Sequence, residues 1–457
     1  MFEPLSPIEA MFLLGETREH PMHVGGLELF TPPDGAGPDF VDSLYREMRS
    51  HDTFTPLFRK HPTTLLGGIV NVGWTYDDEV DVDYHLRRSA LPRPARVREL
   101  LELTSYLHTG LLDRHRPLWE AHLIEGLADG RFAVYNKFHH ALIDGVSGLR
   151  LAMRTLSTSP REKKIRVPWD LPSRKQSGGP ELPDRSSLAA SIRSAVGSVA
   201  GFAPGTIKVA RAALMEQHLT KSFSAPRTMF NVKIGGARRV AAQSWPLERL
   251  RRVKEASGAT INDVVLAMCA GALRAYLLER GALPDTPLVA MVPVSLRSQA
   301  EADAGGNQVG AILCRLATDV SDPAERLAAI AESVRGNKDV FASLSKVESM
   351  ALSAMLLSPV VFATVPGFLA STAPTFSVVI SNVPGPRKPM YWKGARLDGN
   401  YPISIVLDGL ALNITLTNNG DNLDFGLVGC RHSVPHLQRL LTHLEESLAG
   451  LEQAVIG

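Results

Sequence analysis

Cysteine is scarce in this chain: three occur among 457 residues (Cys269, Cys314 and Cys430), each inside an apolar stretch. None belongs to a C-x-x-C pair or accompanies a histidine pattern of zinc-ligand spacing, which argues against a disulfide scaffold and predicts no metal site. We therefore expect buried thiols and a reducing, cytoplasmic environment. The opening segment, MFEPLSPIEAMFLLGE, also lacks the basic start and small-residue cleavage site of a signal peptide.

An excess of charge of either sign is lacking as well. The 49 Lys and Arg residues nearly balance the 47 Asp and Glu residues, for a formal net charge of +2. Nucleic-acid-binding proteins carry concentrated basic surfaces, so we expect no DNA or RNA partner. Glycine-rich phosphate loops and internal repeats are also missing. With 44% hydrophobic residues, a chain of this length is sufficient for two globular domains.

Residues 349–386 carry no charge at all. The segment is long enough to raise the question of a membrane span, but Pro359, Pro366 and Pro374 interrupt it. Near its end, TFSVVIS (375–381) has the pattern of a strand. We expect a buried helix, an apolar corridor and a core strand; the alternative is a shallow hairpin that contacts a membrane.

The domain organisation follows from changes in composition along the chain. Short strands and helices alternate from about residue 5 to residue 158, and residues 161–184 are then rich in proline, glycine and charge, as in a linker. The basic, small-residue-rich segment that follows fits a crossover helix or a helix on a lipid surface. We predict an N-terminal domain over 1–184, linker helices over 185–235 and a C-terminal domain over 236–457.

Hydrophobic periodicity predicts the individual elements. The expected strands are 22–30, 131–138, 287–294 and 375–381. One helix is expected to begin at residue 40, and four more are expected over 97–112, 146–156, 246–255 and 262–280.

The motif with the most chemical content is HHALIDG (139–145), at the end of an apolar run. Before it, Phe132, Val134 and Phe138 alternate at period two, which predicts a strand that is at least half buried. After it, apolar residues recur at helical spacing. The two histidines therefore stand where a strand stops, a position at which a rigid scaffold can hold a reactive side chain.

An imidazole titrates near neutrality, so a neutral histidine there can accept a proton from a hydroxyl group while that hydroxyl attacks a carbonyl. The alternative is structural: backbone carbonyls satisfy the histidines, and Asp144 caps the next helix. Asn262 and Asp263, at the start of a predicted helix, have the same capping alternative. The residues alone leave these alternatives open.

Several separated segments together resemble the bacterial wax ester synthase/acyl-CoA:diacylglycerol acyltransferase family. Each segment is weak evidence alone, but the ordered set covers almost the whole chain. The segments are PLSPIEAMFLLGE, MHVGGLELF, LDRHRPLWEAHLIEGL, KFHHALIDGVSG, ATINDVVLAMCAGALRAYL, VPVSLR, GGNQVG, SNVPGP and LNITLTNNGDNLDFGL.

The resemblance implies an α/β fold in which two chloramphenicol-acetyltransferase-like domains enclose a central channel. It implies acyl transfer from acyl-CoA, the co-substrate, to diacylglycerol or to a long-chain alcohol, without a bound cofactor or a covalent acyl-enzyme. Because these acceptors reside in lipid, we expect peripheral association with the inner face of the membrane or with lipid inclusions. Residues 193–211 and 350–369 are the candidate contact segments.

The resemblance also implies roles for single residues. His140 would be the general base, through Nε2, and His139 would position it. Asp144 would pair with Arg297 from the other domain, and Gly145 would allow a close backbone approach to the channel. The supporting or substrate-binding candidates are Asn262, Asp263, Asn382, Pro384 and Gly385, while Trp119 would be a packing residue or border the acyl pocket.

Two other functions remain open from the sequence. Peptide-synthetase condensation domains, which use carrier-protein thioesters, share the HHxxxDG pattern, although the PLWE, Asn-Asp and NVPGP segments favour the acyltransferase. A non-catalytic lipid-binding paralogue is the other alternative, and the intact His140 argues against it.

Overall fold

The computed structural model describes residues 3–65, 70–172, 225–295, 309–343 and 373–457 and divides into two compact units. Unit 1 comprises residues 1–203, 384–405 and 418–420; unit 2 comprises 204–383, 406–417 and 421–457. The sequence-based boundaries at 184 and 235 did not anticipate that unit 1 includes a segment from the C-terminal half of the chain.

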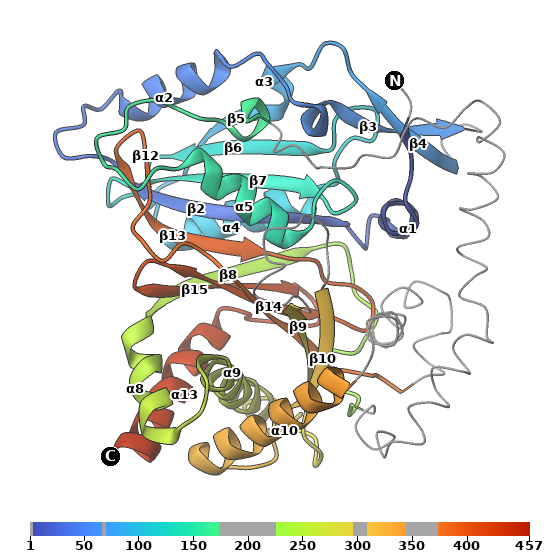
Figure 1. Cartoon of the computed structure of the whole chain (residues 1–457), viewed down its shortest axis with the longest axis vertical. Helices are drawn as coiled ribbons and strands as arrows, with labels where there is room; N and C mark the ends of the chain where they lie inside the picture. Colours follow the sequence, from blue (N-terminus) through green and yellow to red (C-terminus); the bar gives the residue numbers. More distant parts are fainter. Residues whose placement is uncertain (1–2, 66–69, 173–224, 296–308, 344–372) are drawn as a thin grey trace. The chain divides into compact units, whose positions relative to one another are not determined.

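Unit 1 contains a six-stranded sheet in the order β12-β13-β2-β7-β6-β5 and a three-stranded sheet in the order β1-β4-β3 (Figure 1). Strands β12 and β13 complete the larger sheet because β13 pairs antiparallel with β2. The elements of unit 1 are β1 (Glu3–Pro4), α1 (Pro7–Gly15), β2 (His23–Thr31), α2 (Phe40–Arg49), η1 (Pro56–Arg59), β3 (Lys60–Leu65), β4 (Val70–Tyr76), α3 (Val82–His85), β5 (Leu86–Ala90), α4 (Val97–Thr109), β6 (Trp119–Glu125), β7 (Phe132–His139), α5 (Gly145–Thr155), η2 (Pro168–Asp170), β12 (Tyr391–Trp392) and β13 (Ala395–Ile403).

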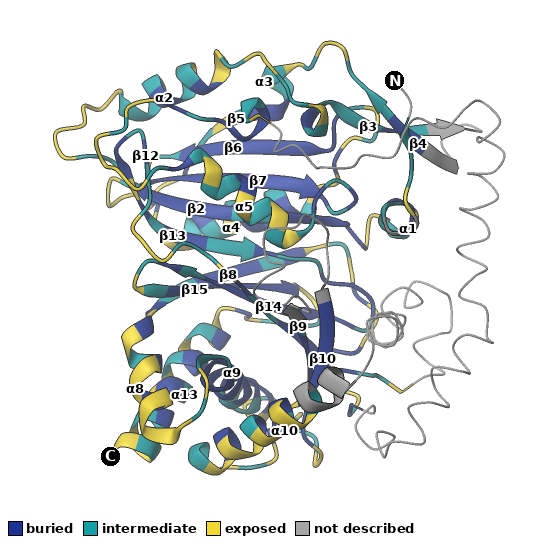
Figure 2. Cartoon of the chain, in the orientation of Figure 1, coloured by how far each residue is buried: buried dark blue, intermediate teal, exposed yellow. Residues whose placement is uncertain are grey.

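Strand β7 lies inside this sheet, antiparallel to β2 on one side and to β6 on the other. All eight of its residues are buried, as the dark ribbon in Figure 2 shows. Phe132, Val134 and Phe138 belong to a core that includes Trp119 and Trp169. The predicted period-two alternation is therefore correct, but the opposite face is buried as well, and it is covered by α4.

Unit 2 contains a second six-stranded sheet, in the order β10-β9-β11-β14-β15-β8. Helices α8, α9, α10 and α13 pack against one another beside it (Figure 1). The elements are β8 (Arg238–Pro246), α8 (Leu247–Ser257), α9 (Ile261–Leu278), β9 (Val289–Ser295), β10 (Val309–Arg315), α10 (Pro323–Ser343), β11 (Val378–Val383), β14 (Leu412–Asn419), β15 (Asn422–Cys430) and α13 (Arg439–Ile456).

Helix α9 is, among the described residues, the one helix long and apolar enough to cross a membrane. Residues Val264 to Ala270 are all fully buried, and α9 packs against α8, α10 and α13. These contacts are those of a core helix. The three cysteines are also buried and form no disulfide, as predicted.

The predicted elements agree closely with those of the structure. The expected strands at 22–30, 131–138, 287–294 and 375–381 correspond to β2, β7, β9 and β11, and the expected helices correspond to α2, α4, α5, α8 and α9. The apolar segment 349–372 and the basic segment 185–217 lie outside the described residues.

Candidate active site

The histidine motif forms a tight corner between β7 and α5. His139 is the last residue of β7, and its carbonyl accepts a hydrogen bond from the Leu142 N–H at 2.9 Å, which closes the turn. The His140 N–H donates to the Met22 carbonyl at 2.7 Å, immediately before β2 begins. The backbone of both histidines is therefore fixed by hydrogen bonds that do not depend on their rings.

Asp144 caps helix α5. Its carboxylate accepts hydrogen bonds from the Ser147 N–H at 2.8 Å and from the Ser147 hydroxyl at 2.9 Å. The first of these bonds satisfies one of the backbone donors that every helix start leaves unpaired. The structural alternative for Asp144 is thus confirmed. Its predicted partner, Arg297, lies outside the described residues, so the pairing stays a prediction.

The His139 ring is fully buried, and its two nitrogens face groups of opposite character. Nδ1 accepts a hydrogen bond from the Ala141 N–H at 3.1 Å. An amide N–H can only donate, so Nδ1 must be unprotonated and the ring proton lies on Nε2. That nitrogen lies 3.3 Å from Glu16 Oε1, slightly beyond the usual hydrogen-bond range. The contact orients the ring toward a carboxylate.

Glu16 is the residue at this corner that the sequence analysis missed. It follows α1, and its side chain is only 2% exposed. Arg114 donates to Glu16 Oε2 from Nε at 3.1 Å and from Nη2 at 3.0 Å, and the Met22 N–H donates to Oε1 at 3.2 Å. Burial raises the pKa of Glu16, but the contacts with His139, Arg114 and Met22 outweigh it and hold the pKa below its ordinary value. The carboxylate is therefore ionised at neutral pH.

His140 has a less polar environment. Its ring stacks on Phe12 of α1, with ring centroids 4.1 Å apart and planes 12° apart. The residue as a whole is half-buried, yet its surroundings are dense enough that desolvation lowers its pKa to about 4. The His140 carbonyl and Asp144 oppose that shift. The imidazole is consequently neutral at physiological pH and is able to accept a proton.

A second group of ionisable residues lies beside this corner on the α4 side of the sheet. Lys137 Nζ is 3.0 Å from Glu120 Oε2 and donates to the carbonyls of Leu107 and Gly110 at the end of α4, each at 3.1 Å. Burial raises the pKa of Glu120, but the contacts with His122, Lys137 and Arg87 lower it by more than burial raises it. The resulting pKa is about 2. The signal in the sequence was the charged residues within the otherwise apolar segments PLWEAHLI and VYNKFHH.

Two other residues of unit 1 have clear structural roles. Trp119 is buried against Phe58 and Trp169 and donates to the Phe58 carbonyl at 3.0 Å, so the packing interpretation is confirmed. A Cβ atom placed on Gly145 would meet no described heavy atom within 4 Å. The described part of the chain therefore gives no steric reason for a glycine at this position.

The remaining site candidates lie at or near the ends of elements in the second half of the chain. Asp263 and Thr260 form a capping box at the start of α9, with Asp263 Oδ2 accepting from the Thr260 N–H at 2.9 Å and hydroxyl at 2.7 Å. Asn262 is half-buried in the same turn. Asn382 lies in β11, and Pro384 and Gly385 follow that strand at the point where the chain passes from unit 2 to unit 1.

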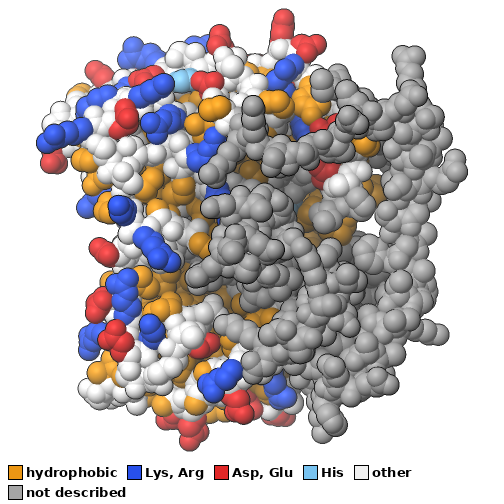
Figure 3. All heavy atoms as spheres, in the orientation of Figure 1, with side chains coloured by type: hydrophobic (Ala, Val, Ile, Leu, Met, Phe, Trp, Pro, Cys, Tyr) orange, Lys and Arg blue, Asp and Glu red, His pale blue; other side chains and the backbone are white. Residues whose placement is uncertain are grey.

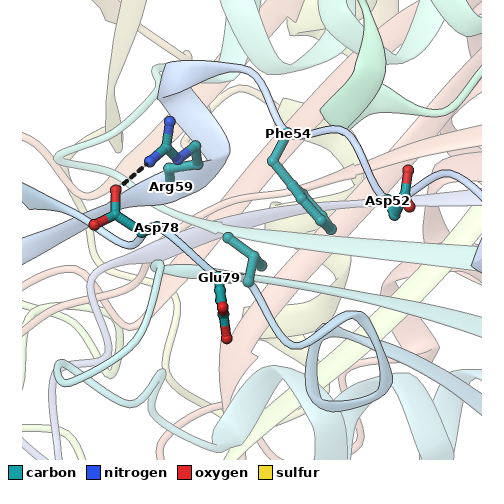
Figure 4. Close-up of a pocket in the computed structure, with 6 residues that line it drawn as sticks. Asp52, Phe54, Arg59, Asp78 and Glu79 are labelled. Carbon is teal, nitrogen blue, oxygen red and sulfur yellow. Dashed lines mark hydrogen bonds and ion pairs between the residues drawn. The ribbon is translucent and has the colours of Figure 1, made fainter.

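A cavity of about 340 Å³ lies elsewhere in unit 1, lined by Asp52, Phe54, Arg59, Asp78, Glu79 and Val80 (Figure 4). Asp78 pairs with Arg59 at 2.9 Å. The other two acidic residues of the lining, Asp52 and Glu79, have no second basic residue in the lining to balance them, so the rim is net negative. Such a rim repels the phosphates of coenzyme A. We therefore assign this cavity no part in binding that substrate.

Among the residues that the structure describes, no group of three or more His, Cys, Asp or Glu side chains is placed so that it could hold a metal ion. On the described part of the face shown in Figure 3, basic and acidic side chains are interspersed, in agreement with the balanced composition.

Comparison with known proteins connects this geometry to a family. The wax ester synthase/diacylglycerol acyltransferase catalytic domain matches residues 5–265, and the C-terminal domain of the same family matches residues 305–452. A probable diacylglycerol O-acyltransferase, tgs2 of Mycobacterium tuberculosis, is 62% identical over 451 residues, which cover 99% of both chains. A Mycobacterium bovis protein named as a putative diacylglycerol O-acyltransferase is 42% identical over 99% of this chain and 92% of its own.

Solved structures agree with these sequence matches. The wax ester synthase/diacylglycerol acyltransferase of Marinobacter aquaeolei aligns with a TM-score of 0.81 and 42% identity over 99% of this chain and 100% of the other. The first condensation domain of the CDA synthetase aligns with a TM-score of 0.59 at 19% identity, over 100% and 96% of the two chains, which establishes a shared fold only. The predicted chloramphenicol-acetyltransferase-like α/β fold is thereby confirmed, and the chain belongs to the wax ester synthase/diacylglycerol acyltransferase family of acyltransferases.

Proposed function

We propose that this chain transfers an acyl group from acyl-CoA to the free hydroxyl of diacylglycerol, with His140 as the general base. The observation that carries the proposal is the neutral imidazole of His140, set at the end of a rigid strand and stacked on Phe12. A neutral ring in a fixed plane is what proton abstraction from an alcohol requires. The relatives named as diacylglycerol O-acyltransferases support the choice of acceptor.

The reaction consists of one acyl transfer without a covalent acyl-enzyme. His140 Nε2 accepts the proton of the acceptor hydroxyl while the oxygen attacks the thioester carbonyl. The C–S bond then breaks, and the coenzyme A thiolate takes the proton back from the imidazolium, so the products are the ester and free coenzyme A. A pKa of about 4 makes the resting ring a weak base, but the negative charge that develops on the substrate stabilises the imidazolium during the transfer.

A long-chain alcohol is a second proposed acceptor and would give a wax ester. The supporting observation is the 42% identity to the Marinobacter protein, whose name includes both activities. Both acceptors present a hydroxyl group to the same base, so the chemistry at His140 is unchanged. Discrimination between the two acceptors would therefore have to come from groups that contact the acceptor away from its hydroxyl.

We further propose that the protein works in the cytoplasm as a peripheral enzyme at the inner face of the membrane or at lipid inclusions. Both acceptors reside in lipid, and peripheral proteins reach such substrates through exposed apolar side chains. Leu14, Tyr106 and Leu111 of unit 1 are exposed large apolar residues of this kind. Flotation with anionic liposomes tests the proposal, and failure to bind any liposome would contradict it.

The decisive experiment measures coenzyme A release and ester formation by the purified protein with palmitoyl-CoA and either dioleoylglycerol or hexadecanol. Triacylglycerol formation supports the first acceptor, and wax ester formation supports the second. A condensation-type enzyme would be inactive with both unless a carrier-protein thioester were supplied. A non-catalytic lipid-binding protein would bind the lipid and release no coenzyme A.

A further inference from the structure

Helix α1 and the residue after it contact the histidine corner from one side. Phe12 lies in the middle of the helix and stacks on the His140 ring, whereas Glu16 follows the helix and lies 3.3 Å from His139 Nε2. One short element therefore contacts both histidines, through two side chains about one helical turn apart.

The helix is itself anchored at both ends. Ser6 and Glu9 form a capping box at its start. At its end, Arg114 Nη2 donates to the Leu13 carbonyl at 2.6 Å while the same guanidinium binds Glu16. Arg114 thus fixes the last turn of α1 and the carboxylate in a single arrangement.

The Glu16 carboxylate is surrounded by donors alone. Oε2 accepts from Arg114, and Oε1 accepts from the Met22 N–H and faces the Nε2–H of His139. A carboxylate accepts at both oxygens, whereas an amide of the same shape accepts at one and donates at the other. The site therefore discriminates between glutamate and glutamine even though the two side chains have nearly equal volume.

Two separate routes connect Glu16 to His140. In the first, Glu16 faces Nε2–H of His139, whose Nδ1 accepts from the Ala141 N–H on the far side of His140. In the second, the backbone of Met22 makes both bonds: its N–H donates to Glu16, and its carbonyl accepts from the His140 N–H. The carboxylate thus holds the peptide groups on both sides of the His140 ring without touching that ring.

We infer that Glu16 is a positioning residue for the reacting histidine: with Arg114 it fixes the tautomer of His139 and the backbone of the corner, while Phe12 fixes the plane of the His140 ring. The inference rests on the proposed general-base role of His140. It assigns α1 a part in the reaction beyond packing, because a base that rotates or shifts by about 1 Å loses on the order of a hundred-fold in rate.

The test is the isosteric variant Glu16→Gln. Arg114, as a charged donor, takes the amide oxygen, so the amide NH₂ faces His139 Nε2 and the Met22 N–H. His139 then relieves the conflict by moving its proton to Nδ1, where it opposes the Ala141 N–H, or by rotating. We expect kcat to fall roughly ten- to a hundred-fold, with the KM values for palmitoyl-CoA and dioleoylglycerol changed by less than about two-fold.

A matched control is Glu9→Gln, the same substitution at the start of α1, whereas Glu16 follows the end of that helix. Glu9 accepts the Ser6 N–H at 2.6 Å in an exposed capping box and contacts neither histidine. This variant is expected to keep the wild-type kcat even if it lowers Tm slightly. A difference between the two variants therefore separates positioning of the base from general stability of α1.

A readout independent of activity is the protonation pattern of the histidine rings in the ligand-free protein, followed by magnetic resonance of isotope-labelled histidine side chains. The Nε2–H form of His139 should be seen in the wild type and in Glu9→Gln, and lost in Glu16→Gln. A wild-type kcat together with an unchanged His139 tautomer in Glu16→Gln would overturn the inference.

If Glu16→Gln does not fold, Arg114→Lys takes its place. Lysine keeps a positive charge beside the carboxylate but lacks the fork that binds Glu16 and the Leu13 carbonyl together. A lower kcat with unchanged KM supports the inference, and an unchanged kcat in this variant overturns it. If the wild type itself forms no ester while its His139 remains in the Nε2–H form, the proposed function fails and the geometry of the corner stands.

Discussion

The two faces of the large sheet in unit 1 differ sharply although they share the same strands. On β7, Phe132, Val134 and Phe138 face a core that contains Trp119 and Trp169. Tyr135, Lys137 and His139 occupy the alternate positions of the strand and face the opposite side, on which α4 lies. Alternation along a strand places neighbours on opposite faces, so a single eight-residue strand supplies both an aromatic core and an ionisable layer.

The ionisable layer is connected by hydrogen bonds rather than by close packing alone. His23 Nε2 donates to the His108 carbonyl of α4 at 2.7 Å, and His108 Nδ1 lies 2.8 Å from the Tyr135 hydroxyl. Burial places the pKa of His23 well below its ordinary value, so this ring is neutral and needs only polar partners. Lys137 and Glu120 form a buried ion pair in this layer, and Glu120 Oε1 also lies 3.3 Å from Arg87 Nη2.

The difference shows what each face contributes. The free energy of burying apolar side chains depends little on their orientation, whereas hydrogen bonds and ion pairs fix the orientation of specific groups. The aromatic face contributes apolar burial to the sheet, and the ionisable face holds the end of α4 through the bonds from Lys137 and Tyr135. The histidine corner lies at the end of the strand that carries both.

The largest effect is expected from a substitution that removes the proposed general base and leaves both faces of the sheet unchanged. His140→Ala should lower kcat by about two to four orders of magnitude, because general-base assistance is typically that large. Tm should change little, since the His140 backbone bond to Met22 does not involve the ring. Steady-state kinetics with a melting curve on the same sample checks both parts. A well-folded variant with near-normal turnover would remove His140 from the mechanism.

The next largest effect is expected on the free energy of unfolding, from a substitution in the ionisable face. Lys137→Met removes the cation that binds Glu120 Oε2 and the last carbonyls of α4. Breaking a buried ion pair typically destabilises a protein by about 3–5 kcal/mol, and because Arg87 still lies 3.3 Å from Glu120 Oε1, we expect a loss toward the lower end of that range. Denaturant unfolding measures the loss. The control Lys254→Met makes the same replacement at an exposed position of α8, where about 0.5 kcal/mol or less is expected.

The double variant Glu120→Leu with Lys137→Met sharpens this result. Because it removes both charges, it should recover much of the stability that Lys137→Met loses, as replacement of whole buried ion pairs by apolar residues commonly does. A double variant as unstable as the sum of the two single variants would mean that the residues do not act as a pair.

The pH dependence of kcat/KM tests the environment of His140. The folded-state pKa of about 4 lies below the ordinary histidine value, so the base stays neutral until the pH falls close to 4. The acid limb should therefore lie near pH 4 rather than near pH 6.5, with circular dichroism at each pH as the check on folding. A midpoint near 6.5 would contradict the buried environment.

The free energy of unfolding should also depend on pH through His140, and the sign of that dependence can be stated. The unfolded chain binds a proton at His140 below about pH 6.5, whereas the folded chain does not until about pH 4. The stability associated with the neutral ring is thus fully present above pH 6.5 and declines as the pH falls toward 4. His140→Ala should flatten this part of the curve of unfolding free energy against pH.

Local patterns in the sequence predicted the corner well. The period-two residues before His139 and the helical spacing after Asp144 define a strand, a turn and a helix, and these elements were found where they were expected. Such patterns reflect contacts between neighbours along the chain, which a single sequence records directly. The packing role of Trp119, by contrast, was expected from the resemblance to the family and not from a local period.

The contacts that hold the corner could not be predicted in this way. Glu16 reaches His139 through an approach of segments far apart in the sequence, and β13 joins β2 in a similar manner. Neither pairing leaves a local period. A glutamate in an apolar helix end such as AMFLLGE is equally consistent with a solvated surface residue, and only the fold reveals that its carboxylate is buried.

The smallest expected effect separates two roles of Asp144. Asp144→Ala removes the cap of α5 and should lower stability by about 0.5–2 kcal/mol. Asp39 provides the matched control, because it is the N-cap residue of α2 and makes no side-chain capping bond. Asp39→Ala should therefore change the unfolding free energy by less than Asp144→Ala does.

Asp144→Asn then decides whether the charge matters in addition to the cap. Asparagine caps helices about as well as aspartate, so stability should stay close to that of the wild type. If Asp144 only caps the helix, kcat should also stay within about two-fold, since the corner keeps its hydrogen bonds. A clear loss of kcat at wild-type stability would instead show that the negative charge of Asp144 pairs with a cation. If that cation is Arg297, the Arg297→Gln variant should show the same loss of kcat, and the double variant should lose no more than either single variant. Additive losses would contradict the pairing and leave Asp144 as a helix cap alone.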